Sequence, residues 1–287
     1  MPLSDSEQRC VEYTLNTSPA SRQHSYSLPT GMVHYFEVRP PHQSLRIDSD
    51  AIVETYQRDP LTGLQFEDDD SYFYESNTTR ERYCEYLLPT PLVQLHPETD
   101  RIANVARRQD GTSTASFLVT LTRALHRVLE YRPGVTSVDS TILHVLEHGS
   151  GVCQDFAHLM LAICRRQHIP ARYVSGYLYN GARQGAVSTP AEIRSAQRAR
   201  EQAAPDDGFS ESIAQSFVGT DAMHAWVECL MPDGSWRGFD PTNNLVTNHK
   251  YIKVHFGRDY ADVAPLRGVY RGPIAHTMEV SVVVTQI

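Results

Sequence analysis

The sequence predicts an α+β protein in which helices packed on an antiparallel sheet follow a small all-β N-terminal domain. Three observations carry this prediction. Short alternating segments fill the first ninety residues, helical periodicity begins after prolines at 89–97, and two strands around a tight turn follow the helices. We therefore expect a β-rich domain over residues 1–93 and a second domain over residues 94–287.

The N-terminal domain is read from short strand-like segments. Residues 11–15, 33–38 and 44–48 show alternation or β-branched and aromatic enrichment. The turn signal PLTG at 60–63 predicts a hairpin that joins residues 52–57 to residues 64–66. Residues 71–76 and 80–88 add two more strand-like segments, so a small antiparallel sheet or sandwich is expected.

The second domain begins with helices. Residues 97–108 and 113–129 show helical spacing, the latter with a clear apolar stripe, and residues 137–148 predict a short helix. Residues 152–167 are apolar almost all round, which is typical of a helix buried on every side. Residues 172–179 then read as a strand.

The remainder of the chain combines an insertion with further strands. Residues 181–220 are rich in Ala, Arg, Gln and Ser and poor in large apolar residues, so we expect an exposed insertion or lid. Residues 222–231 and 235–240 predict two strands around the turn PDG at 232–234. Residues 276–284 alternate like a final strand.

Composition indicates a globular protein and disfavours two kinds of partner. Of the 287 residues, 40% are hydrophobic, and 26 basic against 34 acidic residues give a net charge of −8. Nucleic acids and anionic membranes attract cationic surfaces, so neither is expected as a partner. Five scattered cysteines without a C-x-x-C pair disfavour disulfides and zinc ribbons, and we see no signal peptide, so a cytoplasmic protein is expected.

One cysteine lies where a thiolate would be stabilised. Cys153 follows GSGV at 149–152 and opens the apolar helix. Unpaired N–H groups at a helix N-terminus carry about half a positive charge, which favours a thiolate and can bind the oxyanion of a reacting carbonyl. Asp155 opposes this effect with its own negative charge. Taken alone, such a cysteine is more often a small core residue.

A histidine and an aspartate are predicted to meet on the following hairpin. Alternation along residues 222–231 puts His224 on the less apolar face of its strand, which we expect to be half-open. A three-residue loop at 232–234 would place Thr242 opposite His224 and Asp240 diagonal to it, about 7–8 Å away. A carboxylate there would fix the imidazole tautomer and stabilise the imidazolium. A two-residue loop would instead put the two side chains on opposite faces.

Several blocks resemble the transglutaminase-like superfamily, and most closely its bacterial branch. They are GVCQDFAH at 151–158, IPARYVSGY at 169–177, HAWVE at 224–228, GFDPTN at 238–243 and GRDYADVAP at 257–265. The resemblance covers residues 97–285, with a weaker match in the β-rich region. It implies a papain-like α+β core in which Cys153 is the nucleophile, His224 the base and Asp240 the residue that orients it.

The same resemblance implies acyl-enzyme chemistry on peptide or glutamine amides, with hydrolysis favoured over transamidation and without a metal or organic cofactor. Candidates for oxyanion or substrate contacts are Gln154, Tyr131, Trp226 and Asn243. A transglutaminase-type cross-linker and a non-catalytic binding module with a vestigial triad remain alternatives. A zinc hydrolase is a third, because His144 and His148 match the pattern H-x-x-E-H.

Overall fold

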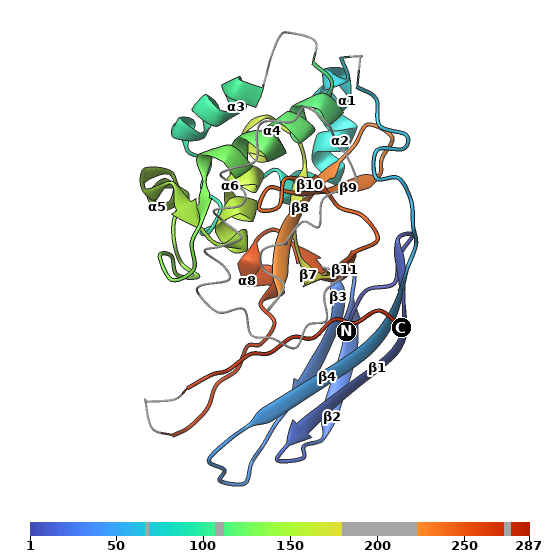
Figure 1. Cartoon of the computed structure of the whole chain (residues 1–287), viewed down its shortest axis with the longest axis vertical. Helices are drawn as coiled ribbons and strands as arrows, with labels where there is room; N and C mark the ends of the chain where they lie inside the picture. The colour runs from blue at the N-terminus through green and yellow to red at the C-terminus, as the bar shows by residue number, and fades with distance from the viewer. Residues whose placement is uncertain (67–68, 107–111, 180–222, 273–276) are drawn as a thin grey trace.

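A computed structural model describes residues 1–66, 69–106, 112–179, 223–272 and 277–287. The helices gather with one antiparallel sheet at one end of the molecule, and the N-terminal strands extend from the other end (Figure 1). The α+β architecture is therefore as expected. The expected insertion over residues 181–220 lies outside the described residues.

Two separate antiparallel pairs form the N-terminal region. Strand β1 (Gln8–Ser18) pairs with β4 (Arg46–Thr55), and β2 (Gln23–Leu28) pairs with β3 (Gly31–Phe36). Strand β4 spans most of residues 44–48 and 52–57, which we expected to form separate strands. The expected hairpin over residues 52–66 is wrong, because β4 pairs with β1 and the chain then turns at 59–64 without a returning strand.

Residues 71–88 are helical, which corrects the strands expected at 71–76 and 80–88. Helices α1 (Ser71–Glu75) and α2 (Asn77–Arg82) are followed by the 3-10 helix η1 (Cys84–Tyr86). Each element buries a single residue, such as Tyr74, whose hydroxyl donates to the carbonyl of Leu230 over 2.8 Å. The buried tyrosines, Tyr74 and Tyr86, therefore belong to two different short helices and do not line one face of a strand. The boundary near residue 93 stays a prediction.

The expected helices of the second domain are present. They are η2 (Pro97–Thr99), α3 (Asp100–Ala106), α4 (Thr114–Val128), α5 (Ile142–His148) and α6 (Cys153–Arg166). Helix α5 is shorter than expected, since Thr141 caps it by accepting from the backbone N–H of His144. Every residue from 154 to 165 in α6 is buried, as its apolar composition predicted.

A five-stranded antiparallel sheet carries His224 and Asp240. Its order is β10-β9-β8-β7-β11, with β7 (Ala171–Leu178), β8 (His224–Leu230), β9 (Trp236–Asp240), β10 (Leu245–Val246) and β11 (Tyr251–Gly257). We did not expect β10 and β11, nor the short parallel pair of β5 (Glu130–Tyr131) and β6 (Ser150–Gly151) or helix α8 (Tyr260–Val263).

The final strand expected at 276–284 is not formed within the described residues 277–287. Met278, Val280 and Val283 are each more than 60% exposed. These apolar side chains therefore have no buried face of a sheet to pack against, which is the condition that an alternating strand pattern assumes.

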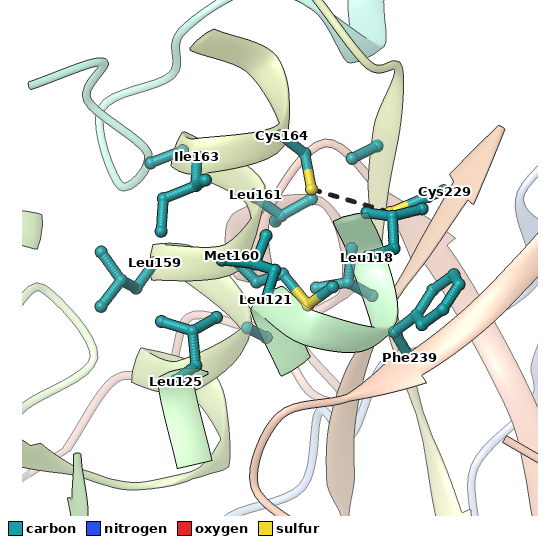
Figure 2. Close-up of a cluster of buried hydrophobic side chains, with 14 of the residues drawn as sticks. Leu118, Leu121, Leu125, Leu159, Met160, Leu161, Ile163, Cys164, Cys229 and Phe239 are labelled. Carbon is teal, nitrogen blue, oxygen red and sulfur yellow. Dashed lines mark hydrogen bonds between the residues drawn. The ribbon is translucent and has the colours of Figure 1, made fainter. Parts of the chain in front are cut away.

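Helix α6 and strand β8 meet in the main hydrophobic core. Leucines of α4 and apolar side chains of α6 pack against Cys229 and Phe239, which lie at one side of the cluster (Figure 2). The Sγ atoms of Cys164 and Cys229 lie 3.8 Å apart there. The opposite face of β8 is also covered, because Trp226 packs with Val174, Leu178 and Tyr251 in a second cluster. In the described parts of the chain we find no helix long and apolar enough to span a bilayer.

A buried ion cluster ties the N-terminal segment to this second face. Glu228 of β8 contacts Lys253 Nζ at 2.5 Å and Arg172 Nη2 at 2.5 Å. Lys253 also contacts Asp5 at 2.9 Å and Glu7 at 3.1 Å. The buried Lys253 therefore joins the start of the chain to the strand that carries His224.

Candidate active site

Cys153 is the first residue of α6, at the glycine-led junction that the sequence indicated. The preceding N–H of Val152 donates to Asp155 Oδ2 over 2.7 Å, and the hydroxyl of Thr136 donates to the same oxygen over 2.7 Å. A Cβ at Gly151 would lie 2.6 Å from that oxygen, so the close approach requires glycine. Cys153 itself is partly exposed, in contrast to the buried residues 154 to 165 that follow it in the helix.

Asp155 caps α6. From the sequence, we expected its negative charge to oppose a thiolate at Cys153. Burial raises the pKa of Asp155, although its bonds to Val152 and Thr136 act in the opposite direction. The carboxyl group accepts from the N–H that precedes the helix and from a loop hydroxyl. Its position is thus explained by helix capping.

His224 lies at the start of β8 and is fully buried, whereas we expected it on a half-open face. The expectation was wrong because the Trp226 cluster covers that face as well. The imidazole Nε2 lies 2.8 Å from Asp240 Oδ2. Burial favours the neutral ring, but the charge and the hydrogen bond of Asp240, together with the neighbouring Cys153 thiol, outweigh it and raise the pKa of His224 to about 10.

The second ring nitrogen of His224, Nδ1, is buried and has no hydrogen-bond partner among the described residues. The Cys153 thiol is close enough to raise the pKa of the imidazole. A buried polar nitrogen without a partner is rare in a folded protein, so Nδ1 marks this imidazole as a candidate for a functional role.

Asp240 reaches His224 through the hairpin register that the sequence predicted. The N–H of Met231 donates to the carbonyl of Ser235 over 2.8 Å, which closes a three-residue loop. Val227 then pairs with Phe239 and Glu228 with Gly238. This register is the predicted one, and it places Asp240 diagonal to His224 at hydrogen-bond distance.

Five hydrogen bonds hold the Asp240 carboxylate. Oδ2 accepts from His224, from the Asn243 side chain and from the Tyr251 hydroxyl, each over 2.8 Å. Oδ1 accepts from the N–H groups of Thr242 and Asn243 over 2.9 and 3.1 Å. Burial acts to raise the pKa of Asp240, but the charge of His224 and these bonds lower it overall. The group is therefore held as a carboxylate beside the imidazole.

Sequence reasoning missed Tyr251. Its strand β11 pairs with β7 and not with β8 or β9, so no local register connects it to Asp240. The alternating segment YIKVHF at 251–256 was a readable strand signal, but it did not indicate a contact with the carboxylate. The ring packs edge-on against Trp226 with centroids 5.3 Å apart.

The four candidate oxyanion and substrate residues fall into two groups. Trp226 and Asn243 lie beside the imidazole, with the Trp226 ring 6.2 Å from the His224 ring and Asn243 Nδ2 3.4 Å from His224 Nε2. The other two lie around the start of α6. Gln154 Nε2 donates to the carbonyl of Val138 over 3.0 Å, and Tyr131 pairs with Gly151. Their roles in catalysis stay predictions.

The zinc alternative gains no support from the described residues, among which no group of three or more metal-ligating side chains is assembled. The rings of His144 and His148 do lie together, with centroids 4.1 Å apart. His148 Nδ1, however, lies 2.8 Å from the carbonyl of His144. The pair therefore forms a local contact on α5 without a third ligand.

Comparison with known proteins assigns the family. Residues 102–241 match the transglutaminase-like superfamily and residues 1–54 match the bacterial transglutaminase-like N-terminal region. An uncharacterised protein of Mycobacterium leprae is 33% identical over 292 residues, covering 100% of this chain and 90% of its own. An uncharacterised protein of Mycobacterium tuberculosis is 32% identical over 279 residues, covering 93% of this chain and 79% of its own.

A solved structure supports the same fold. The crystal structure of a candidate cysteine protease from Cytophaga hutchinsonii aligns with a TM-score of 0.62 at 21% identity, covering 92% of this chain and 76% of that protein. At that identity the likeness concerns the fold alone. Together with the sequence matches, it leads to one conclusion: the chain belongs to the transglutaminase-like superfamily and carries the bacterial N-terminal region of that family.

Proposed function

We propose that this protein is a cysteine-nucleophile enzyme that acts on peptide or glutamine amides of a peptide or protein substrate. Cys153 is the nucleophile, His224 transfers protons and Asp240 orients the imidazole. The observation that carries the proposal is the buried contact between His224 Nε2 and Asp240, with Nδ1 left available near the thiol. Such an arrangement supplies a nucleophile and a proton donor without a cofactor.

The proposed reaction proceeds through a thioester. The Cys153 thiolate attacks the amide carbonyl, and the protonated His224 donates its proton to the departing nitrogen, which leaves as ammonia or an amine. The neutral imidazole then takes a proton from water, and the resulting hydroxide attacks the thioester. The carboxylic acid product is released and the thiolate and imidazolium are restored, so atoms and charge balance over the cycle.

A high pKa of His224 suits the resting state of this cycle. With the pKa raised to about 10, the imidazole is protonated at neutral pH and can stabilise a thiolate as an ion pair. The five bonds to Asp240 keep the carboxylate fixed beside Nε2 of the imidazole. Pre-organisation of this kind supports proton transfer at a defined atom, which a binding module would not need.

Alkylation by iodoacetamide at pH 6 tests the activated thiolate. Cys84 is exposed and serves as an internal reference in the same molecule. An ordinary thiol is only about 0.3% ionised at pH 6, so an ion-paired Cys153 should react at least about tenfold faster than Cys84. His224→Ala should remove this advantage. Equal slow alkylation of both cysteines in the wild type would contradict the proposal and favour the vestigial-triad alternative.

Product analysis separates hydrolysis from transamidation. A library of glutamine-containing peptides is incubated with wild type and with Cys153→Ala, each with and without added methylamine. Hydrolysis is favoured by resemblance to the bacterial branch, and it would give deamidated or cleaved peptides at the same rate with and without the amine. Predominant incorporation of methylamine would instead identify a cross-linking type of transferase.

A further inference from the structure

The loop between β5 and α5 forms an open pocket beside the start of α6. The depression has a volume of about 580 Å³, within the usual range for ligand sites. Its polar lining consists of Thr136, Ser137, Asp139, Ser140, Thr141 and His144. The pocket is thus built from hydroxyl groups, one imidazole and one carboxylate.

Two hydrogen bonds fasten this pocket to the residues directly after the candidate nucleophile. The Thr136 hydroxyl donates to Asp155 Oδ2 over 2.7 Å, and Gln154 Nε2 donates to the carbonyl of Val138 over 3.0 Å. Gln154 and Asp155 are both buried in the first turn of α6. Because the wall of the pocket is held from both of these positions, its location relative to Cys153 is fixed.

Among the residues that the structure describes, Asp139 carries the only carboxylate that lines the pocket. Among the described residues it makes no ion pair and no side-chain hydrogen bond, in contrast to Asp155 and Asp240. The hydroxyl oxygens of Ser140 and Thr141 are already engaged as acceptors of backbone N–H groups. The described residues that line the pocket include no lysine or arginine to neutralise Asp139.

This chemistry selects for a cation. A lone carboxylate among hydroxyl groups repels acidic groups and supplies acceptors to an ammonium or guanidinium. The net charge of −8 adds a field of the same sign over the whole molecule. The volume accommodates a lysine or arginine side chain together with part of the neighbouring backbone.

We propose that this pocket is a substrate subsite that receives a lysine or arginine side chain flanking the reactive amide. The proposal rests on the proposed function, since it names the substrate class of that same site. Asp139 acts here as a specificity-determining residue and takes no part in bond making. Asp139 is exposed, and an exposed ion pair changes affinity about two- to fivefold, which sets the size of the expected preference.

Peptide binding to Cys153→Ala tests the subsite without requiring turnover. Fluorescein-labelled glutamine heptapeptides carry lysine, norleucine or glutamate at each of three positions on either side of the glutamine, and their dissociation constants are measured by anisotropy. We expect lysine at one position to bind about two- to fivefold more tightly than norleucine, and glutamate to bind more weakly. Adding Asp139→Asn should abolish the lysine preference and leave the norleucine peptide unchanged.

A matched control and a second readout make the outcomes distinct. Asp50→Asn removes one exposed carboxylate from β4 and should leave the lysine preference intact. Equal binding of lysine and norleucine peptides, or a lysine preference that survives Asp139→Asn, would overturn the subsite. The same peptides are then given to the wild-type enzyme. A lysine preference that depends on Asp139, without release of ammonia or cleavage of any peptide, would overturn the proposed function and leave the subsite standing.

Discussion

Replacement of Tyr251 by phenylalanine removes a single oxygen from the candidate site. The hydroxyl donates to Asp240 Oδ2 over 2.8 Å, and the ring stays packed against Trp226 in the variant. A hydrogen bond to a charged group contributes about 1.5–3 kcal/mol. Since Asp240 accepts five donors with about four lone-pair sites, we expect a loss at the lower end, about 1.5 kcal/mol.

Urea unfolding followed by tryptophan fluorescence measures this loss. The midpoint should fall while the slope of unfolding free energy against urea stays constant, because the same surface is exposed on unfolding. Tyr26→Phe removes an equivalent hydroxyl from a ring that is 52% exposed and should change nothing. An unfolding free energy for Tyr251→Phe within about 0.5 kcal/mol of the wild type, the usual size of a neutral surface change, would show that the bond to Asp240 does not stabilise the site.

Three further predictions concern the sheet that carries His224. Gly176→Ala should lower the free energy of unfolding by about 1–3 kcal/mol, because its Cβ would lie 2.6 Å from Trp226 and would collide with the β11 backbone. Gly268→Ala adds a methyl group in open space and should leave thermal unfolding unchanged. Lys253→Met should lower the free energy of unfolding by about 3 kcal/mol, because it leaves Glu228 buried with one cation fewer. Arg39→Met breaks a surface pair and should leave the melting temperature unchanged. In the folded protein the pKa of His224 is raised from 6.5 to about 10. The contribution of the protonated imidazole to the free energy of unfolding is therefore fully present below about pH 6.5 and is lost as the pH rises toward 10. The stability difference between wild type and His224→Gln should shrink over that window, and a constant difference would show that the imidazole does not titrate as inferred.

Local geometry explains why the sequence predicted that Asp240 lies next to His224. The turn at 232–234 fixes the register of β8 and β9, and register alone determines that Asp240 is diagonal to His224. Likewise, the glycines and the apolar run that follows them are enough to place Cys153 at the first residue of a buried helix. In both cases the relevant residues are close in sequence or belong to one hairpin.

Long-range packing explains what the sequence could not predict. The burial of His224 depends on Tyr251 and on strand β7, which meet β8 from distant parts of the chain. The helices at 71–88 depend similarly on single contacts such as that of Tyr74 with Leu230. Alternation within a segment indicates which side chains share a face, but another element decides whether that face is covered.

Strand β8 joins the two halves of the candidate site because its two faces are buried against different partners. Its odd-numbered residues, including Cys229, pack on α6, the helix that begins at Cys153 (Figure 2). Its even-numbered residues place His224 in the Asp240 network and Glu228 in the ion cluster with Lys253. A strand held on both faces cannot rotate or slide without breaking one of these sets. The packing of β8 on both faces therefore holds His224 in place relative to α6, the helix that begins at Cys153.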